Sequence, residues 1–311
     1  FRHFPVDAQM QVALKMAERI GYDTGRGRLD LTVHPFEISF TRQDVRITTR
    51  VSPDYMPMSL FGALHEAGHA LYEQNVDPDY TRTPLATDLV SLYAVGGVSF
   101  GAHESQSRLW ENHVGRSRAF WANHIDELRA AYPGLLDDVD AEEFYRAVNR
   151  SEPSFIRVEA DELTYDFHIM LRCELEAALI DGSLEVAELP EAWNAAMKSY
   201  LGVDVPDDAN GVLQDVHWSS GQIGTFCNYT IGNIMAAQLF DTATRGQPGI
   251  ASALEAGDYA PLRDWLSENV CRHGRRFSRD ELLTRATGRP LDPEPYIAHL
   301  RAKFSDIYAL A

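Results

Sequence analysis

Two histidines and a glutamate lie close together in the segment from Ser59 to Tyr72, which reads SLFGALHEAGHALY. His65 and His69 are four residues apart, so in a helix both imidazoles leave the same face and can bind one metal ion. Glu66 follows the first histidine, and from there its carboxylate can reach a water molecule on that metal as a general base. The residue types and their spacing predict a metal-dependent hydrolytic site.

A chance occurrence of this pattern on an exposed helix is the competing interpretation. Apolar side chains flank the motif at Leu60, Phe61, Leu64 and Leu71. They predict that the motif is partly buried, and burial of two histidines and a glutamate costs free energy unless these groups bind something. The apolar flanks therefore favour the metal site.

A third protein ligand is required, because a catalytic zinc ion uses three protein ligands and keeps one position open for water. Glu104 lies in the sequence His-Glu-Ser-Gln that begins at His103, where we expect the next helix to start. Spacing alone does not separate Glu104 from other acids, among them Glu73 and Asp88.

The composition narrows the possible partners and the setting of the protein. With 28 basic and 46 acidic residues the formal net charge is −18, which repels phosphates and argues against nucleic acid as a partner. We expect neither a membrane-spanning segment nor a signal peptide, because no apolar run is long enough. The three cysteines, Cys173, Cys227 and Cys271, form no CxxC pair, which favours a reduced, cytoplasmic setting.

The elements that must position these residues are helices, apart from one short region. Between residues 28 and 51 apolar and polar residues alternate, as at Leu29, Leu31 and Val33, which predicts a small meander of two or three strands. Apolar residues at helical spacing, separated by prolines, predict helices over about 5–21, 58–75, 103–131, 141–149, 158–181, 188–201, 222–244, 249–256, 259–272, 278–286 and 293–309. Without repeats or a linker, we expect one mainly α catalytic domain over residues 1–311.

Several separated motifs occur in a fixed order along the chain. They are Asp44-x-Arg46-x-Thr48, His65-Glu-Ala-Gly-His69, His103-Glu-Ser-Gln106, Ile156-Arg157-x-x-Ala-Asp161, Gly211-x-x-Gln-Asp215-x-His217-Trp218 and Gly224-Thr-Phe-x-x-Tyr229-x-x-Gly-Asn233. In this order they resemble the signature motifs of the carboxypeptidase Taq family, from about residue 40 to the C-terminus. The resemblance implies a mainly α, neurolysin-like metallopeptidase body with a deep groove and a small sheet beside the active site.

The resemblance also implies an activity and a ligand set. Members of this family bind zinc, or cobalt as a substitute, and remove single residues from peptide C-termini with broad specificity. The family's metal ligands map onto His65, His69 and Glu104, and its general base maps onto Glu66. Because members are commonly homodimers, we expect peptide substrates and a second copy of the chain as partners.

Two arginines are candidates for substrate binding. A C-terminal carboxylate calls for the bidentate fork of an arginine, and Arg157 is the first candidate. The alternative is that Arg157 only pairs with Glu159 or Asp161 nearby. Arg46 is the second candidate, although beside Asp44 on a strand it is better suited to organise the sheet than to contact substrate.

Two neutral donors are candidates for stabilising the oxyanion that hydrolysis creates. His217 or Tyr229 could donate to it, while each could equally be a core residue with a satisfied polar tip. Asp215 is a candidate to orient a histidine. In the mechanism these residues imply, Glu66 moves a proton from water to the leaving amine while Arg157 holds the terminal carboxylate.

Two features depart from the family pattern. The chain begins at Phe1, without the helical region that usually precedes this point and forms part of the groove wall. The segment from Pro84 to His103 is longer than in the family, with extra residues near Leu92–Gly101 that could reshape the groove floor or move Glu104. Two alternatives therefore accompany the carboxypeptidase: an oligopeptidase or endopeptidase with the same metal centre, and an inactive peptide-binding helical module that needs a partner chain.

Overall fold

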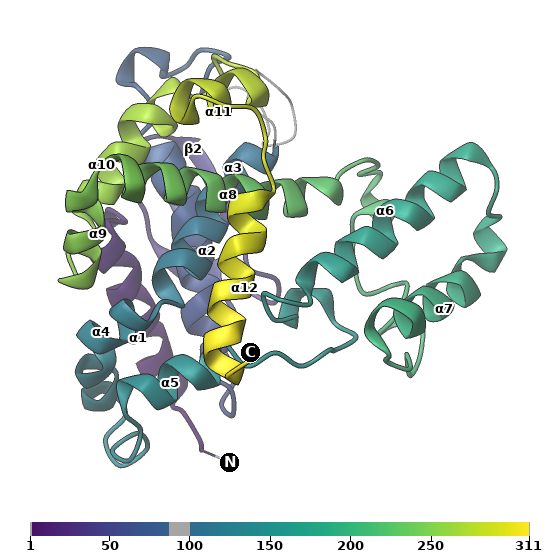
Figure 1. The fold of residues 1–311 in the computed structure, drawn as a ribbon, viewed down its shortest axis with the longest axis horizontal. Coiled ribbons are helices and arrows are strands. Elements are labelled where there is room, and N and C mark those ends of the chain that lie inside the picture. Colours follow the sequence, from purple (N-terminus) through teal and green to yellow (C-terminus); the bar gives the residue numbers. More distant parts are fainter. Residues whose placement is uncertain (1, 87–99, 311) are drawn as a thin grey trace. The chain divides into compact units, whose positions relative to one another are not determined.

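The computed structural model describes residues 2–86 and 100–310 of the chain, which divide into two compact units (Figure 1). The first unit combines Phe1–Val148 with Gly232–Ala302, and the second combines Asn149–Ile231 with Lys303–Ala311. The expected mainly α architecture with a small sheet is confirmed. The assignment of residues 1–311 to one catalytic domain stays a prediction. Among the described helices, none is long and apolar enough to cross a membrane.

The sheet of the first unit has three strands, β1 (Leu29–Leu31), β2 (Glu37–Thr41) and β3 (Asp44–Thr49). Their order is β1-β3-β2: β2 and β3 are antiparallel, whereas β1 pairs with β3 in parallel. The predicted meander is therefore wrong in its connectivity, because a meander would place β1 next to β2. Alternating hydrophobicity reports which face of a strand is buried but not which strand is its neighbour.

The helix that carries the histidine motif, α2 (Pro57–Gln74), is buried on most of its surface. It begins with a proline in its first turn, a position where the missing N–H costs nothing. It packs against the sheet, against α1 (Val6–Ile20) and against α3 (Phe100–Arg108). A helix that is apolar on several faces is a core helix, so the motif lies inside the first unit.

A glycine brings α2 and α3 into close contact. A Cβ atom added at Gly68 would lie 2.6 Å from the carbonyl oxygen of Gln106 and 2.6 Å from Cα of Ser107. Both are backbone atoms, so a change of side-chain rotamer could not make room. The absence of a side chain at Gly68 therefore sets the distance between the two helices that carry the histidines and Glu104.

We expect Gly68→Ala to lower the free energy of unfolding by about 1–3 kcal/mol, the usual cost of overpacking a core. The matched control is Gly249→Ala in α9 (Pro248–Glu255), where nothing lies within 4 Å of an added Cβ. There alanine improves helix propensity and should leave stability equal or slightly higher. Urea denaturation measures both variants, and equal stabilities would contradict the close contact.

The helix predicted over residues 103–131 is wrong as a single element. After α3 the chain continues as a π-helical segment, Leu109–Gly115, and leaves the helix before α4 (Arg118–Ala131). Ser117 caps α4, because its hydroxyl accepts the N–H of Phe120. The apolar spacing runs through both helices, so periodicity alone merges them.

The other helices lie close to the predicted segments. They are α5 (Ala141–Val148), α8 (Cys227–Gly246), α9, α10 (Ala260–Asn269), α11 (Arg279–Thr287) and α12 (Glu294–Tyr308). Helix α8 begins five residues later than predicted from 222, and α10 ends before a short 3₁₀ turn at Cys271–His273.

In the second unit α6 (Tyr165–Asp181) and α7 (Leu189–Leu201) lie side by side (Figure 1). Their contact buries Leu171, Trp193 and Met197. The helix predicted from residue 158 begins at 165, because Asp161 forms a turn in which its carboxylate accepts the N–H groups of residues 163 and 164.

Candidate metal centre

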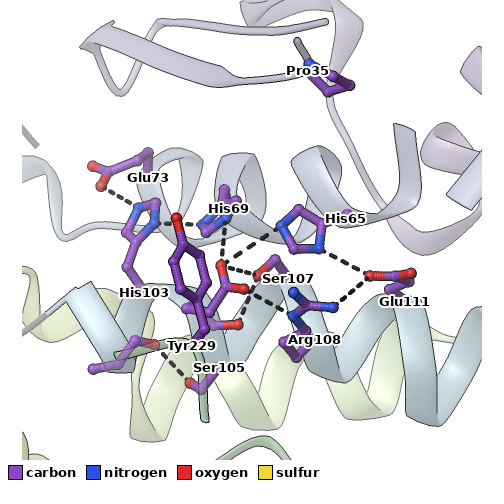
Figure 2. Close-up of polar contacts among 12 residues, drawn as sticks. Pro35, His65, His69, Glu73, His103, Ser105, Ser107, Arg108, Glu111 and Tyr229 are labelled. Carbon is purple, nitrogen blue, oxygen red and sulfur yellow. Dashed lines mark hydrogen bonds and ion pairs between the residues drawn. The ribbon is translucent and has the colours of Figure 1, made fainter. Parts of the chain in front are cut away.

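Three donor atoms from two helices converge in the first unit. Glu104 Oε2 on α3 lies 3.1 Å from Nε2 of His69 and 3.6 Å from Nε2 of His65, both on α2 (Figure 2). The three donor atoms lie within 4.8 Å of one another. The structure therefore brings together the residues predicted as metal ligands, in an arrangement that could hold one ion.

The carboxylate of Glu104 is held so that one oxygen faces the histidines. Arg108 Nε donates to Oε1 at 2.8 Å, and the Ser107 hydroxyl donates to Oε2 at 3.0 Å. Space for the side chain comes from Gly232 on α8, where an added Cβ would lie 2.5 Å from Cγ of Glu104. The fixed orientation leaves Oε2 directed at the imidazoles.

The charges of this group suit a divalent cation. Burial opposes ionisation of Glu104, but the neighbouring His65 and Arg108 outweigh it and hold its pKa well below the usual range. Burial lowers the pKa of His69 to about 3, so its imidazole is neutral. Glu104 and His69 are therefore in the protonation states that bind a metal. Two imidazoles with one carboxylate are a common zinc donor set.

Glu111 orients His65. Its Oε2 lies 3.0 Å from Nδ1 of His65 and 3.6 Å from Nη1 of Arg108 (Figure 2). Its Oε1 lies 3.1 Å from Nη2 of Arg116. Burial opposes ionisation of Glu111, but its hydrogen bond to His65 and the charge of Arg116 lower its pKa to about 2. An ionised carboxylate only accepts, so His65 donates from Nδ1, and Nε2 is the nitrogen left to bind an ion. Burial lowers the pKa of His65, but the charge of Glu104 and the hydrogen bond to Glu111 outweigh burial and raise that pKa, so an ion would displace the proton from Nε2.

Glu111 escaped the sequence analysis, although a signal for it was present. It follows Glu104 by seven residues, about two helical turns, so both acids lie on one helix face. Glu104, Arg108 and Glu111 share this face, and together they would have indicated a charged surface that contacts the two histidines.

Glu73 does not belong to the ligand set. Its carboxylate accepts hydrogen bonds from two nitrogens of Arg275, at 2.6 and 3.0 Å, and lies 2.8 Å from Nε2 of His103. The alternative that Glu73 is the third ligand is therefore wrong. Asp88, the other alternative, lies outside the described residues, as do residues 92–99 of the segment expected to be longer than in the family.

Glu66 is buried and follows His65 directly on α2, and its role as a general base stays a prediction. Burial raises its pKa to about 7 in the metal-free site; His65 counteracts this, and the like charges of Glu104 and Glu111 add to it. A carboxyl group that exchanges its proton near neutrality suits proton transfer, because general acid–base catalysis is most efficient when the pKa lies near the working pH.

Arg157 lies in the second unit, buried in a cluster of charges. Its Nε and Nη2 donate to Oδ1 of Asp215 at 2.9 and 2.7 Å, and its Nη1 donates to the Tyr165 hydroxyl at 2.9 Å. Asp215 also accepts from Arg172 Nε at 2.7 Å through its other oxygen. Pairing of Arg157 with Glu159 or Asp161 is therefore wrong, and its role in substrate binding stays a prediction.

The predicted oxyanion donors form a pair in the same unit. His217 Nε2 lies 2.8 Å from the Tyr229 hydroxyl, and the ring of His217 packs on Phe226. Asp215 Oδ1 lies 3.9 Å from Nδ1 of His217, so its shorter contacts are to the arginines. The catalytic roles of His217 and Tyr229 stay predictions.

Arg46 lies on the exposed side of β3. Its Nε and Nη2 donate to the two carboxylate oxygens of Asp44, each at 2.8 Å, and its guanidinium covers the ring of Phe40. These contacts are those of a residue that organises the sheet, and a contact with substrate stays a prediction.

We expect Asp215→Asn to destabilise the protein by about 3–5 kcal/mol, because two buried guanidinium groups would lose their anion. Burial opposes ionisation of Asp215, but the charges of Arg157 and Arg172 lower its pKa to about 2. Asp204→Asn is the control, since Asp204 pairs with Lys198 in solvent at 2.7 Å and should be replaceable without effect. Urea denaturation compares the variants, and equal stabilities would rule out an essential buried ion cluster.

Comparison with known proteins agrees with these observations. The family model of the carboxypeptidase Taq (M32) metallopeptidases matches residues 1–304. The chain is 44% identical over 307 residues to thermostable carboxypeptidase 1 of Thermus thermophilus, covering 99% of this chain and 58% of that protein. It is 41% identical over 307 residues to carboxypeptidase 1 of Bacillus subtilis, covering 99% of this chain and 60% of that one.

Solved structures give the same result. The crystal structure of an M32 carboxypeptidase from Deinococcus radiodurans superposes with a TM-score of 0.93 at 47% identity, covering 99% of this chain and 61% of that chain. A carboxypeptidase structure from Pyrococcus furiosus superposes with a TM-score of 0.90 at 36% identity, covering 97% and 59%. The chain thus spans less than two thirds of the length of these relatives. Because the family model matches nearly every residue present, the chain belongs to the carboxypeptidase Taq (M32) metallopeptidase family.

Proposed function

We propose that this chain carries the catalytic centre of a metal-dependent carboxypeptidase that releases single amino acids from peptide C-termini with broad specificity. The observation that carries the proposal is the convergence of His65, His69 and Glu104, with Glu66 buried beside them. The named relatives are carboxypeptidases, which supports the choice of reaction.

We propose Zn²⁺ as the ion held by His65, His69 and Glu104, with Co²⁺ as a substitute. Support comes from the donor set, since two neutral imidazoles and one carboxylate occur in catalytic zinc sites that keep a position open. When bound, such an ion polarises a carbonyl group and makes a water molecule acidic enough to act as a nucleophile near neutral pH.

The side chains of this chain then move protons and hold the substrate. Glu66 accepts a proton from the attacking water and delivers it to the leaving amine, for which its raised pKa is suited. In this proposal Arg157 binds the terminal carboxylate, and His217 or Tyr229 donates to the oxyanion. Arg157 is held by Asp215, and His217 is held by Tyr229. These hydrogen bonds orient the side chains before substrate binds, which supports the proposed roles.

Mass spectrometry of a mixed peptide set, incubated with Zn²⁺-loaded protein, tests the proposal. We expect ladders that shorten one residue at a time from the C-terminus and that are absent with amidated peptides. Internal cuts would replace the carboxypeptidase with an endopeptidase that uses the same centre. Intact peptides despite one bound metal per chain would refute the activity for this chain.

We also propose a homodimer in a cytoplasmic setting. The resemblance to a family of dimers supports the first, and three unpaired cysteines support the second. Light scattering tests the dimer, and the mass of a single chain would contradict it.

A further inference from the structure

His103 lies between a metal ligand and a buried ion pair. Its Nδ1 is 2.6 Å from Nδ1 of His69, and its Nε2 is 2.8 Å from Oε1 of Glu73 (Figure 2). All three side chains are buried, and Glu73 in turn is bound by Arg275 through two nitrogens. Helices α2 and α3 are thus joined by a continuous chain of polar contacts that ends at the ligand histidine.

The positions of the protons follow from the groups at the end of this chain. Two ring nitrogens at 2.6 Å must share one proton, because two N–H groups would clash and two lone pairs would repel each other. Glu73, paired with Arg275, is ionised and can only accept, so His103 donates to it from Nε2. When an ion takes the lone pair on Nε2 of His69, that imidazole carries its proton on Nδ1, and Nδ1 of His103 must then be the acceptor in this contact.

The consequence for His69 concerns its other nitrogen. With the proton on Nδ1, the lone pair of His69 is on Nε2, where it can bind an ion. Without an ion, Nε2 and the ionised Oε2 of Glu104, 3.1 Å apart, need a proton between them, so the tautomer set by His103 is the one that metal binding requires. His65 reaches the same state by a shorter route, since its Nδ1 meets the carboxylate of Glu111 directly. For His69, the imidazole of His103 lies between the ring and the carboxylate of Glu73.

We propose that His103 is a positioning residue for the metal site, which fixes the tautomer and ring orientation of His69 through its contacts with Glu73 and Arg275. The inference rests on the proposed function, because it takes His69 as a metal ligand. Loss of a partner behind a ligand histidine typically costs about 10- to 100-fold in metal affinity. A reduction of that size is expected when the acceptor for His69 is removed.

A matched pair of variants isolates the acceptor. In His103→Asn the side-chain oxygen takes the place of Nδ1 and can still accept from His69, whereas His103→Leu has nearly the same shape but no acceptor. Both variants lose the contact with Glu73, so both should change the unfolding of the metal-free protein by similar amounts. His124→Leu is the control for removal of a buried histidine. His124 lies on α4, and its Nε2 is 2.8 Å from the hydroxyl of Tyr259 rather than from a residue of the metal site.

The readout is Zn²⁺ affinity, measured by competition with a chelator. We expect His103→Leu to lose about 10- to 100-fold, His103→Asn to keep most of the affinity and His124→Leu to match wild type. Equal losses in the Asn and Leu variants would overturn the proposal, because a purely structural role would not distinguish them.

A second measurement needs no variant. In ¹⁵N spectra of the histidines of Zn²⁺-loaded wild type, His69 should carry its proton on Nδ1 and His103 should carry its proton on Nε2 alone. A protonated Nδ1 on His103 would overturn the proposal.

These outcomes separate the inference from the activity. Wild type that binds no Zn²⁺ would overturn both. Metal binding without C-terminal trimming would remove the activity and leave the positioning role of His103 intact.

Discussion

Glu66→Gln is expected to keep its metal and its fold and to lose about 100- to 10,000-fold in turnover, the usual contribution of a general base. Glutamine has the shape of glutamate, so the buried site beside His65 is filled as before, but an amide does not accept the proton of the attacking water. Turnover of a peptide with a free C-terminus, measured at full metal occupancy, decides the matter.

Glu268→Gln is the matched control. Glu268 lies on α10, where it is exposed to solvent and forms an ion pair with Arg272 at 2.6 Å. The same chemical change there should leave turnover as in wild type. A Glu66→Gln variant that retains near-normal turnover with bound metal would remove Glu66 from the mechanism.

Stability of the metal-free protein gives an independent check on the environment of Glu66. Its pKa is raised from 4.5 to about 7, so the folded state binds a proton more tightly than the unfolded state does. The stability this proton confers is present below pH 4.5 and is lost as the pH rises to about 7. We expect Glu66→Gln to gain stability relative to wild type across that interval, and a constant difference would contradict the raised pKa.

His69→Ala is expected to lose both the metal and the turnover. Two of three ligands remain, so affinity should fall by more than the roughly 10- to 100-fold that loss of an outer partner costs. Zn²⁺ in excess should raise the melting temperature of wild type, because an ion that binds only the folded state stabilises it by mass action. In His69→Ala that rise should be absent.

His124→Ala serves as the control for a lost buried histidine. Its metal-free form should melt lower than wild type but should still show the rise with Zn²⁺, because His124 hydrogen-bonds to Tyr259 and Glu127, and neither belongs to the metal site. A Zn²⁺-dependent rise in His69→Ala equal to that of wild type would place the metal elsewhere.

The parts of the site that depend on local geometry could be predicted from the amino-acid sequence. The spacing of His65 and His69 places both imidazoles on one face, because the period of a helix follows from backbone geometry alone. The position of Glu66 next to His65 follows in the same way. Most helices were also predicted correctly, from the spacing of their apolar residues and from the prolines between them. The order of the motifs then selected Glu104 through resemblance to a family.

The pairing of each histidine with its acid depends on contacts that form only in the folded chain. By spacing, Glu73 and Glu104 were both possible ligands, and the contact at Gly68 brings α3 close enough for Glu104. Glu73 is bound instead by Arg275, which is 202 residues away in the chain. The strand order and the partners of Arg157 could not be predicted from the sequence either. Periodicity indicates which face of one element is buried, but it does not identify the segment that packs against that face. The choice of a partner depends on packing between segments that are distant in sequence.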